Sequence, residues 1–454
     1  MRILPRVNED VNEEWISDKA RFAYDGLLLQ RLTTPFVKNN DDELEPVDWE
    51  TAFIKVAERV KICDGSVMAG VAGSLADAEA MVCLKDLLNS LGCETLCTEE
   101  MFPTTKSGID FRSNYILNST IPGIEECDVL LLIATNPRLE APLVNARIRK
   151  TWLHTDMCIF VVGAPVDLSY DYQYLGDSFA VLEDINKGVH PMAKALKLAN
   201  KPMIILGSAG MQRLDSGPIY DIVRNIAEDA ECHCAHENWQ VFNFLHQSAS
   251  QVGALDLGYQ AGINPVKTLK PQLVFLLGAD AGAVKRDDLY QNCTVVYIGH
   301  HGDYGAHMAD VILPGAAYTE KHATYVNTEG RVQEVCQAVA PPGMARQDWT
   351  IIRALSEILN VPLPYDKLKD VRSRLVEVSP TFAHLDVVEK TGFAFISDRT
   401  CREKTITVQK QTAPLVSPFV KLRDFYLTDP ISRASITMAK CVHSLDQSEG
   451  NNQY

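Results

Sequence analysis

Short runs rich in Val, Ile and Leu recur along this chain, and each is followed by a turn of small residues and then by a helical pattern. Parallel strands are buried on both faces and need a crossover connection, so this order is typical of a parallel sheet covered by helices. The expected strands are 66–71, 128–134, 158–162, 203–206, 273–277, 294–298 and 311–313. We therefore predict an α/β fold with doubly wound, mostly parallel sheets, whose ligand sites lie beyond the carboxyl ends of the strands.

The chain has 454 residues, which is longer than one hydrophobic core normally supports. Stretches rich in Gly, Asn and Pro at 258–271 and 341–343 indicate boundaries between packed units. The expected parts are an N-terminal segment, 1–46, that packs on the core, a first α/β domain from 47–118 and 269–362, a second, inserted α/β domain, 119–268, and a helical and irregular C-terminal tail, 363–454.

The charge and hydropathy of the chain exclude two classes of partner. The formal net charge of −16 opposes binding to nucleic acid, which depends on clustered Lys and Arg to neutralise phosphates. No apolar run approaches the roughly 20 residues of a membrane-spanning helix, so we expect no direct membrane span. The acidic residues among 9–14 do not fit a transit peptide, and we expect the sequence to be part of a longer polypeptide.

Twelve cysteines are spread along the chain without paired spacing, which favours a reducing compartment. Iron–sulfur clusters and structural zinc ions draw on closely spaced thiolates, because several ligands must converge on one small centre. The sequence contains no Cys-x-x-Cys, so we expect no cluster and no metal in this chain. The cysteines are Cys63, Cys83, Cys93, Cys97, Cys127, Cys158, Cys232, Cys234, Cys293, Cys336, Cys401 and Cys441.

Two pairs of glycines, Gly70 with Gly73 and Gly207 with Gly210, lie where strands turn into helices. Exposed backbone N–H groups at such turns could bind phosphate, which would make the chain a nucleotide-binding module. Neither pair belongs to a G-x-G-x-x-G motif, so tight turns explain the glycines better.

Two groups of histidines are candidate metal or acid-base sites. Cys232, His233, Cys234 and His236 could supply zinc ligands, but adjacent ligands on one short segment surround an ion poorly, and we favour a surface cluster. The second group follows the strand at 294–298 and consists of His300, His301, Asp303, His307 and Asp310. Its position suits catalysis or metal binding, although a glycine-rich turn whose histidines bond to nearby backbone is the favoured interpretation.

Two stretches carry a resemblance to a known family. ADVILPGAAYTEK at 309–321 with TYVNTEGRVQ at 324–333 resembles the signature of molybdopterin-type oxidoreductases, and DKARFAYDG at 18–26 with RLTTP at 31–35 resembles their early segment. Further segments look closest to the large iron–sulfur subunits of mitochondrial respiratory complex I, and they are MRILPR at 1–6, WISD at 15–18, LCTEE at 96–100, SRAS at 432–435 and MAKC at 438–441.

The resemblance implies a part of the matrix-facing peripheral arm at the mitochondrial inner membrane, where electrons pass from NADH through flavin and clusters to ubiquinone. It implies the other peripheral-arm subunits as partners. In that family the 2Fe–2S and 4Fe–4S clusters are held in an upstream half, and no position here matches a cluster ligand. We therefore expect a non-catalytic, structural part of the subunit, in which no residue is assigned as catalytic, cofactor-binding or metal-binding.

The alternative is a molybdenum or tungsten pterin-dependent oxidoreductase. Catalytic relatives place a metal ligand near the stretch that here runs over 99–115, which offers Thr104, Thr105, Ser107 and Asp110 without selecting one. The residues beyond Leu363 are also too few for the further pterin-binding barrel of those relatives. A retained fold that has lost its cofactor is the favoured interpretation.

On the structural hypothesis, two segments shape a turn or an interface, namely 327–331 and 300–310. A last helix over about 430–444 is a candidate docking element, because apolar residues recur along it at roughly helical spacing. Those apolar residues are Ile431, Ile436, Met438 and Val442.

Overall fold

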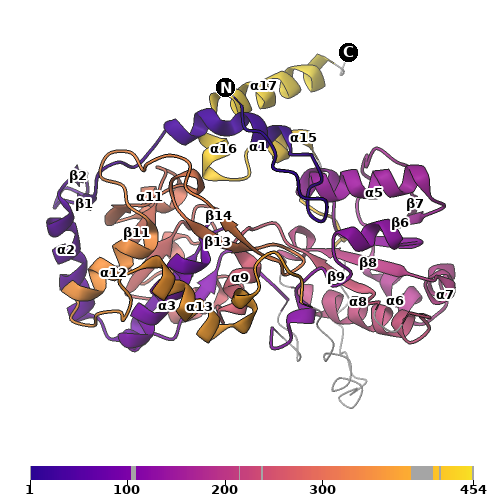
Figure 1. Ribbon diagram of the computed structural model, residues 1–454, viewed down its shortest axis with the longest axis horizontal. Coiled ribbons are helices and arrows are strands. Elements are labelled where there is room, and N and C mark those ends of the chain that lie inside the picture. The colour runs from indigo at the N-terminus through magenta and orange to yellow at the C-terminus, as the bar shows by residue number, and fades with distance from the viewer. Residues whose placement is uncertain are drawn as a thin grey trace.

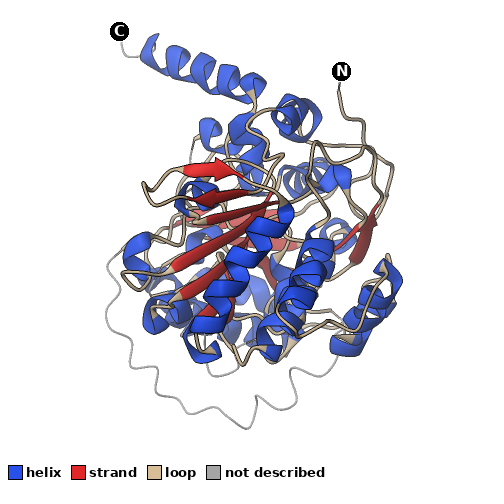
Figure 2. Ribbon diagram, turned by 90° about the vertical axis from the view of Figure 1, so that its left-hand side faces the viewer, coloured by secondary structure: helices blue, strands red, loops and turns tan. Residues whose placement is uncertain are grey.

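The computed structural model describes residues 2–103, 109–213, 215–236, 239–389, 413–418 and 421–451. Two sheets, each covered by helices, form two lobes that lie side by side (Figure 1). Viewed from the side, the strands of one sheet run between layers of helix (Figure 2). The predicted α/β fold with mostly parallel sheets is confirmed.

The first sheet has 7 strands in the order β2-β1-β12-β11-β10-β3-β4. Its five strands from β12 to β4 pair in parallel, whereas β1 pairs antiparallel with both β2 and β12. The strands are β1 (Phe36–Lys38), β2 (Leu44–Pro46), β3 (Met68–Ala72), β4 (Leu96–Thr98), β10 (Leu273–Leu277), β11 (Thr294–Gly299) and β12 (Val311–Pro314).

The second sheet has 5 parallel strands in the order β7-β6-β5-β8-β9. It is built from one continuous stretch of chain that lies between β4 and β10 in sequence. The strands are β5 (Val129–Ile133), β6 (Cys158–Val162), β7 (Gln173–Gly176), β8 (Pro202–Gly207) and β9 (Phe242–Leu245). The central strands of both sheets are almost entirely buried, which explains their continuous apolar sequences.

Helices cover both sheets, and several begin at a side-chain cap. Asp48 and Asp77 accept hydrogen bonds from the first turns of α2 and α3, which satisfies backbone donors that have no partner within the helix. The first sheet carries α2 (Trp49–Ile62), α3 (Ala78–Ser90), α9 (Gln251–Asp256), α10 (Asn264–Leu269), α11 (Tyr304–Met308), α12 (Asp348–Ile358) and α13 (Leu368–Val378). The second sheet carries α4 (Pro137–Glu140), α5 (Pro142–His154), α6 (Phe179–Asn186), α7 (Pro191–Leu198) and α8 (Ser216–Glu231).

The segment 327–331 forms the turn of a two-stranded hairpin made by β13 (Ala323–Val326) and β14 (Val332–Val335). The backbone N–H of Asn327 donates to the carbonyl oxygen of Arg331 at 3.0 Å. Gly330 adopts a positive φ of +82°, which a residue with a side chain rarely adopts. The predicted turn is therefore present.

The two ends of the described chain lie on the same side of the molecule, at the top of both views (Figures 1 and 2). Helix α1 and the 3-10 helix η1 from the N-terminal segment contact the last helices, α16 and α17. The elements are α1 (Asp18–Phe22), η1 (Ala23–Leu28), α15 (Leu422–Tyr426), α16 (Pro430–Ala434) and α17 (Ile436–Asn451).

The prediction of one continuous helix over 430–444 is wrong, because Ser435 adopts an extended conformation and separates α16 from α17. The carboxylate of Asp25 accepts hydrogen bonds from the Ser435 hydroxyl and from the backbone N–H and hydroxyl of Thr437, the latter two at 2.9 Å. Ile431 and Met438 are buried against this chain, so they are not free to contact a partner.

The domain boundaries remain a prediction. Residues 36–46, which the prediction assigned to the N-terminal segment, contribute two strands to the first sheet.

Candidate functional site

Titratable side chains gather where the parallel strands of the first sheet end. The carboxyl ends of neighbouring parallel strands meet at one edge of a sheet, which is where ligands bind in open α/β folds. Asp77 follows β3, Glu99 and Glu100 follow β4, Asp280 follows β10, His300 and His301 follow β11, and Glu320 and Lys321 follow β12; all of them are buried.

The ammonium group of Lys321 lies between two carboxylates. Its Nζ is 2.6 Å from Asp77 Oδ2 and 2.5 Å from Asp348 Oδ2. Burial lowers the pKa of Lys321, but the charges of Asp348 and Asp77 outweigh it and raise that pKa well above its ordinary value. Close by, Glu79 accepts hydrogen bonds from the backbone N–H and hydroxyl of Thr324, both at 2.7 Å. Lys321 is therefore a charged structural ion-pair partner rather than a free amine.

His300 and His301 contact each other in the same buried region, with 2.5 Å between their Nδ1 atoms. His301 Nε2 lies 2.8 Å from the carbonyl oxygen of Gly26, so this nitrogen must donate. Burial lowers the pKa of both rings, which keeps them neutral. A neutral His301 that carries its proton on Nε2 has a lone pair on Nδ1, so His300 Nδ1 donates to it.

The interpretation of the second histidine group as backbone-bonding residues fits only part of it. His301 bonds to a backbone carbonyl that is distant in sequence, whereas His300 bonds to another ring. His307 Nδ1 lies 2.8 Å from the carbonyl oxygen of Asp303, one helical turn earlier. Asp310 accepts a hydrogen bond from the backbone of Val295 at 2.8 Å, next to β12. The group is therefore divided among separate structural contacts.

Glu99 and Asp280 form a second buried acidic pair. The carboxylate of Glu99 lies 3.1 Å from the backbone nitrogen of Ala281, and burial raises the pKa of Glu99 to about 8. Asp280 accepts hydrogen bonds from Tyr297 at 2.6 Å and from the backbone of Gly305 at 3.1 Å, and burial raises its pKa to about 6. At neutral pH Glu99 therefore holds a proton.

The pKa of Glu100, the next residue, is shifted in the opposite direction. Burial raises the pKa of Glu100, but the hydrogen bond and charge of His246 outweigh it, and the pKa lies below its ordinary value. His246 Nδ1 is 3.0 Å from the Glu100 carboxylate, and His246 Nε2 is 2.5 Å from the carbonyl oxygen of Tyr115. The two nitrogens of the His246 ring therefore face a carboxylate oxygen on one side and a backbone carbonyl oxygen on the other. The contact between Glu100 and His246 joins the ends of β4 and β9, which belong to different sheets.

We expect replacement of these two neighbouring carboxyl groups by amides to have opposite effects on the unfolding free energy. Glu99 binds a proton in the folded state between its ordinary pKa of 4.5 and about 8, so its contribution to the unfolding free energy is lost as pH rises through that window. Glu99→Gln should flatten this decline and keep or raise stability at about pH 8. Glu100 contributes stability above its ordinary pKa, so Glu100→Gln should cost about 1–3 kcal/mol at the same pH. Urea unfolding across this pH range measures both variants, and equal losses at the higher pH would contradict the assignment.

The glycine pairs support tight packing rather than a phosphate cradle. A methyl group on Gly73 would overlap the carbonyl oxygen of Gly278, and one on Gly210 would overlap that of Ala134. Gly70 lies within β3, where a methyl group would come to 2.7 Å from Leu88, and one on Gly207 would lie 2.5 Å from Cβ of Thr135. These glycines are needed because neighbouring chain segments approach closely.

The cysteine–histidine group after α8 does not converge. Cys232, His233 and His236 are exposed, while Cys234 Sγ lies 3.2 Å from the carbonyl oxygen of Asn200. Within the described ranges, no group of three or more His, Cys, Asp or Glu side chains could hold a metal ion. Of the four residues that the stretch 99–115 offers as candidate metal ligands, Asp110 is exposed. Thr104, Thr105 and Ser107 lie outside the described residues.

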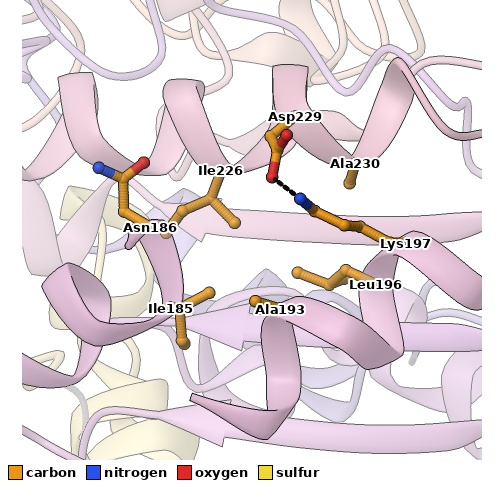
Figure 3. Close-up of a pocket in the computed structure, with 8 residues that line it drawn as sticks. All are labelled: Ile185, Asn186, Ala193, Leu196, Lys197, Ile226, Asp229 and Ala230. Carbon is orange, nitrogen blue, oxygen red and sulfur yellow. Dashed lines mark ion pairs between the residues drawn. The ribbon is translucent and has the colours of Figure 1, made fainter. Parts of the chain in front are cut away.

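A small surface hollow lies far from these charges, between α6, α7 and α8 of the second sheet (Figure 3). Apolar side chains of Ile185, Leu196 and Ile226 line it, and the ion pair between Lys197 and Asp229 crosses it at 2.8 Å. With one ion pair across it and Asn186 as the other polar side chain labelled in Figure 3, the hollow lacks the converging polar groups of a ligand site.

Comparison with known proteins identifies the family. The sequence model of the molybdopterin oxidoreductase family matches residues 31–358, which is most of the chain. The chain belongs to the molybdopterin oxidoreductase family. In this member, residues 1–25 also match the NADH-ubiquinone oxidoreductase NDSU1/NuoG-like 4Fe-4S domain, and residues 387–441 match the C-terminal region of an NADH-ubiquinone oxidoreductase subunit.

The curated relatives of this molybdopterin oxidoreductase family member include subunits of NADH-ubiquinone oxidoreductase. It is 46% identical to the mitochondrial NADH-ubiquinone oxidoreductase 78 kDa subunit of Candida albicans, over 97% of this chain and 60% of that protein. It is 43% identical to the NADH-ubiquinone oxidoreductase 75 kDa subunit of Reclinomonas americana, over 97% of this chain and 64% of that protein. The chain thus spans less than two thirds of the length of these relatives.

A solved structure supports the fold alone. One chain of the formyltransferase/hydrolase complex of Methylorubrum extorquens matches with a TM-score of 0.50 and 14% identity, covering 72% of this chain and 98% of that one. No described helix of this molybdopterin oxidoreductase family member has both the length and the apolar character needed to cross a membrane.

The described residues do not fit the pterin cofactor of the family. A phosphate-bearing cofactor needs free backbone N–H groups and cations at the carboxyl ends of the strands. Here the backbone donors of Ala281, Ser248 and Asn136 are hydrogen-bonded to the carboxyl groups of Glu99, Glu100 and Glu140, respectively. The nearby cations are also paired within the chain, Arg31 with Glu320, Lys321 with Asp77 and Asp348, and Arg433 with Asp303.

Sequence analysis missed most of these buried charges. Glu79, Lys321 and Asp348 are far apart in sequence, and although Lys321 ends the signature stretch 309–321, no spacing pattern connects the three residues. One signal was available for Glu99 and Glu100, because polar residues directly after a buried strand lie at the ligand-binding edge of a parallel sheet.

Proposed function

We propose that this chain is a non-catalytic, structural part of the large iron–sulfur subunit of respiratory complex I, which transfers electrons from NADH to ubiquinone. It assembles with other subunits of the peripheral arm on the matrix side of the mitochondrial inner membrane. The 2Fe–2S and 4Fe–4S clusters of the subunit are held outside this chain. The observation that carries the proposal is the 46% identity to the Candida albicans 78 kDa subunit over 97% of the chain.

The geometry of the site supports a structural role. Catalysis by a titratable group needs side chains that can reach a substrate. Here Lys321, His300 and His246 are each hydrogen-bonded or ion-paired to other parts of the chain. Their contacts hold the ends of strands and the connections that follow them. On this proposal the charges at the carboxyl edge stabilise a scaffold that positions an electron-transfer module.

Assembly in mitochondria tests the proposal. We expect the tagged full chain to co-migrate with NADH:ubiquinone oxidoreductase on native gels and to be recovered with its other peripheral-arm subunits. The same chain purified alone should be colourless and should not oxidise NADH, since among its described residues no group of three or more His, Cys, Asp or Glu side chains could hold a metal ion. Migration only as free protein would contradict the proposal.

The second candidate is an oxidoreductase with a bound pterin cofactor, favoured by the family match over 31–358. Elemental analysis of the purified chain separates the two candidates. Stoichiometric molybdenum or tungsten would support the enzyme and overturn the structural proposal, whereas amounts far below one equivalent would support the structural proposal.

A further inference from the structure

A segment from the C-terminal part of the chain lies at the carboxyl edge of the second sheet. It consists of residues 413–418, which we call the strap. The strap contacts the connections that follow four neighbouring strands of that sheet, β5, β6, β7 and β8. Ligands of open α/β folds bind beyond this edge. The strap therefore occupies a position that a separate ligand takes in other proteins of this architecture.

The first half of the strap is held through its backbone. Arg213, in the connection after β8, donates to the carbonyl oxygens of Pro414 at 2.8 Å and Ala413 at 3.4 Å. The backbone N–H of Leu415 donates to the carbonyl oxygen of Asp177, which directly follows β7, at 2.6 Å. Such contacts fix the path of a peptide without selecting its sequence.

Two side chains of the strap add selectivity for sequence. Leu415 is completely buried, and its carbonyl oxygen would lie 2.9 Å from a methyl group placed on Gly163, after β6. Ser417 is also buried, and its hydroxyl donates to the carboxylate of Glu140, after β5, at 2.5 Å. Val416, between them, is exposed. Burial of alternate residues is the pattern of an extended chain, so one leucine and one serine face the second lobe together.

The second lobe has its own sheet and helices without the strap. Strands β5 to β9 and helices α4 to α8 come from one continuous stretch, 129–245, whereas the strap arrives much later in the sequence (Figure 1). All six residues of the strap are described, and none of them belongs to a strand or a helix. Backbone hydrogen bonds combined with sites for alternate side chains are also how proteins bind extended peptides.

We propose that the carboxyl edge of the second sheet is a peptide-binding site, formed by Glu140, Gly163, Asp177 and Arg213 and filled by the strap. Its ligand class is an extended peptide that carries a leucine and, two residues later, a serine. The tethered strap competes with other peptides of this class at an effective concentration on the order of millimolar. A partner with the same pattern therefore binds only when the strap leaves. The proposal does not depend on the role in respiratory complex I.

The test uses the full chain with residues 413–418 replaced by Gly-Ser-Gly-Ser-Gly-Ser, which we call the linker chain. The probe is a fluorescein-labelled peptide with the sequence of residues 413–418. Fluorescence anisotropy should show saturable binding to the linker chain and at least about tenfold weaker binding to the wild-type chain, because the strap occupies the site. The changes Leu415→Asp or Ser417→Ala in the peptide should each weaken binding at least about tenfold.

Two variants of the linker chain form a matched pair. Glu140→Gln weakens the acceptor for the Ser417 hydroxyl and should weaken binding about tenfold. This effect should disappear with the Ser417→Ala peptide, which a merely structural role of Glu140 would not produce. Asp156→Asn changes an exposed acid just before β6, at the amino edge of the same sheet, and should leave binding unchanged.

Circular dichroism measures whether the linker chain folds. Absence of saturable binding, equal binding by the linker and wild-type chains, or equal binding of the three peptides would overturn the proposal. An unfolded linker chain would overturn it as well, because the strap would then be part of the core rather than a ligand.

Discussion

Lys321→Met is expected to lower the unfolding free energy by about 3–5 kcal/mol, because it leaves the buried carboxylates of Asp77 and Asp348 without their cation. Methionine is close to lysine in volume, so the packing of the core changes little and the loss reports the charge. Urea unfolding at neutral pH, followed by circular dichroism, measures the effect.

Two further variants control this result. Lys194 is exposed on α7, and Lys194→Met should change stability by less than about 0.5 kcal/mol. Adding Asp348→Asn to Lys321→Met should restore part of the lost stability, because one of the two unpaired charges is removed. A Lys321→Met loss no larger than that of Lys194→Met would show that the buried cluster carries little free energy.

Gly73→Ala is expected to cost about 3 kcal/mol or more, because its methyl group would overlap the carbonyl oxygen of Gly278 and the backbone cannot yield locally. Both sides of Gly73 are fixed: its N–H donates to Leu277 at 2.9 Å, and its carbonyl oxygen accepts from the Ser250 hydroxyl at 2.7 Å. Thermal and urea unfolding measure the loss, and failure to recover folded protein is the extreme of the same outcome.

Gly253→Ala is the matched comparison. Gly253 lies in α9, and a methyl group there would meet Val326 at 3.5 Å, which is an ordinary van der Waals contact. Alanine is the better helix former, so this variant should keep or gain up to about 1 kcal/mol. If both variants lose stability equally, the close approach of Gly73 to Gly278 is not the cause.

The central strands could be predicted from the sequence because burial on both faces requires an unbroken run of apolar residues. β10 lies at the predicted 273–277, since a strand buried on both faces has a continuous apolar sequence. β6 lies at the predicted 158–162, although its first residue, Cys158, is exposed. Short strands at or near the edges were missed. β4 has three residues and β7 is largely exposed, so neither shows the length or the apolar run of a buried strand.

The candidate site could be predicted only in outline. The position of the histidine group after β11 was correct for the edge of the sheet, but the partners of His301 and Glu100 could not be predicted. Gly26 and His246 lie far away in sequence, and hydrogen bonds between such residues depend on how the elements pack. Charged residues such as Lys321 are usually solvated, so sequence alone gives no reason to place one in the core.

The interrupted path of the first sheet constrains the order of events during synthesis. Its central pairing joins β3 to β10, with Met68 opposite Leu273, and its antiparallel border joins Val37 to Val311. The ribosome must therefore finish the whole second lobe before the first sheet can close. The second lobe is continuous in sequence and can form its own core first. Until β10 is synthesised, the edge of β3 that pairs with β10 has no partner strand. β3 and β4 are therefore the part of the nascent chain that most needs protection from aggregation, for example by a chaperone.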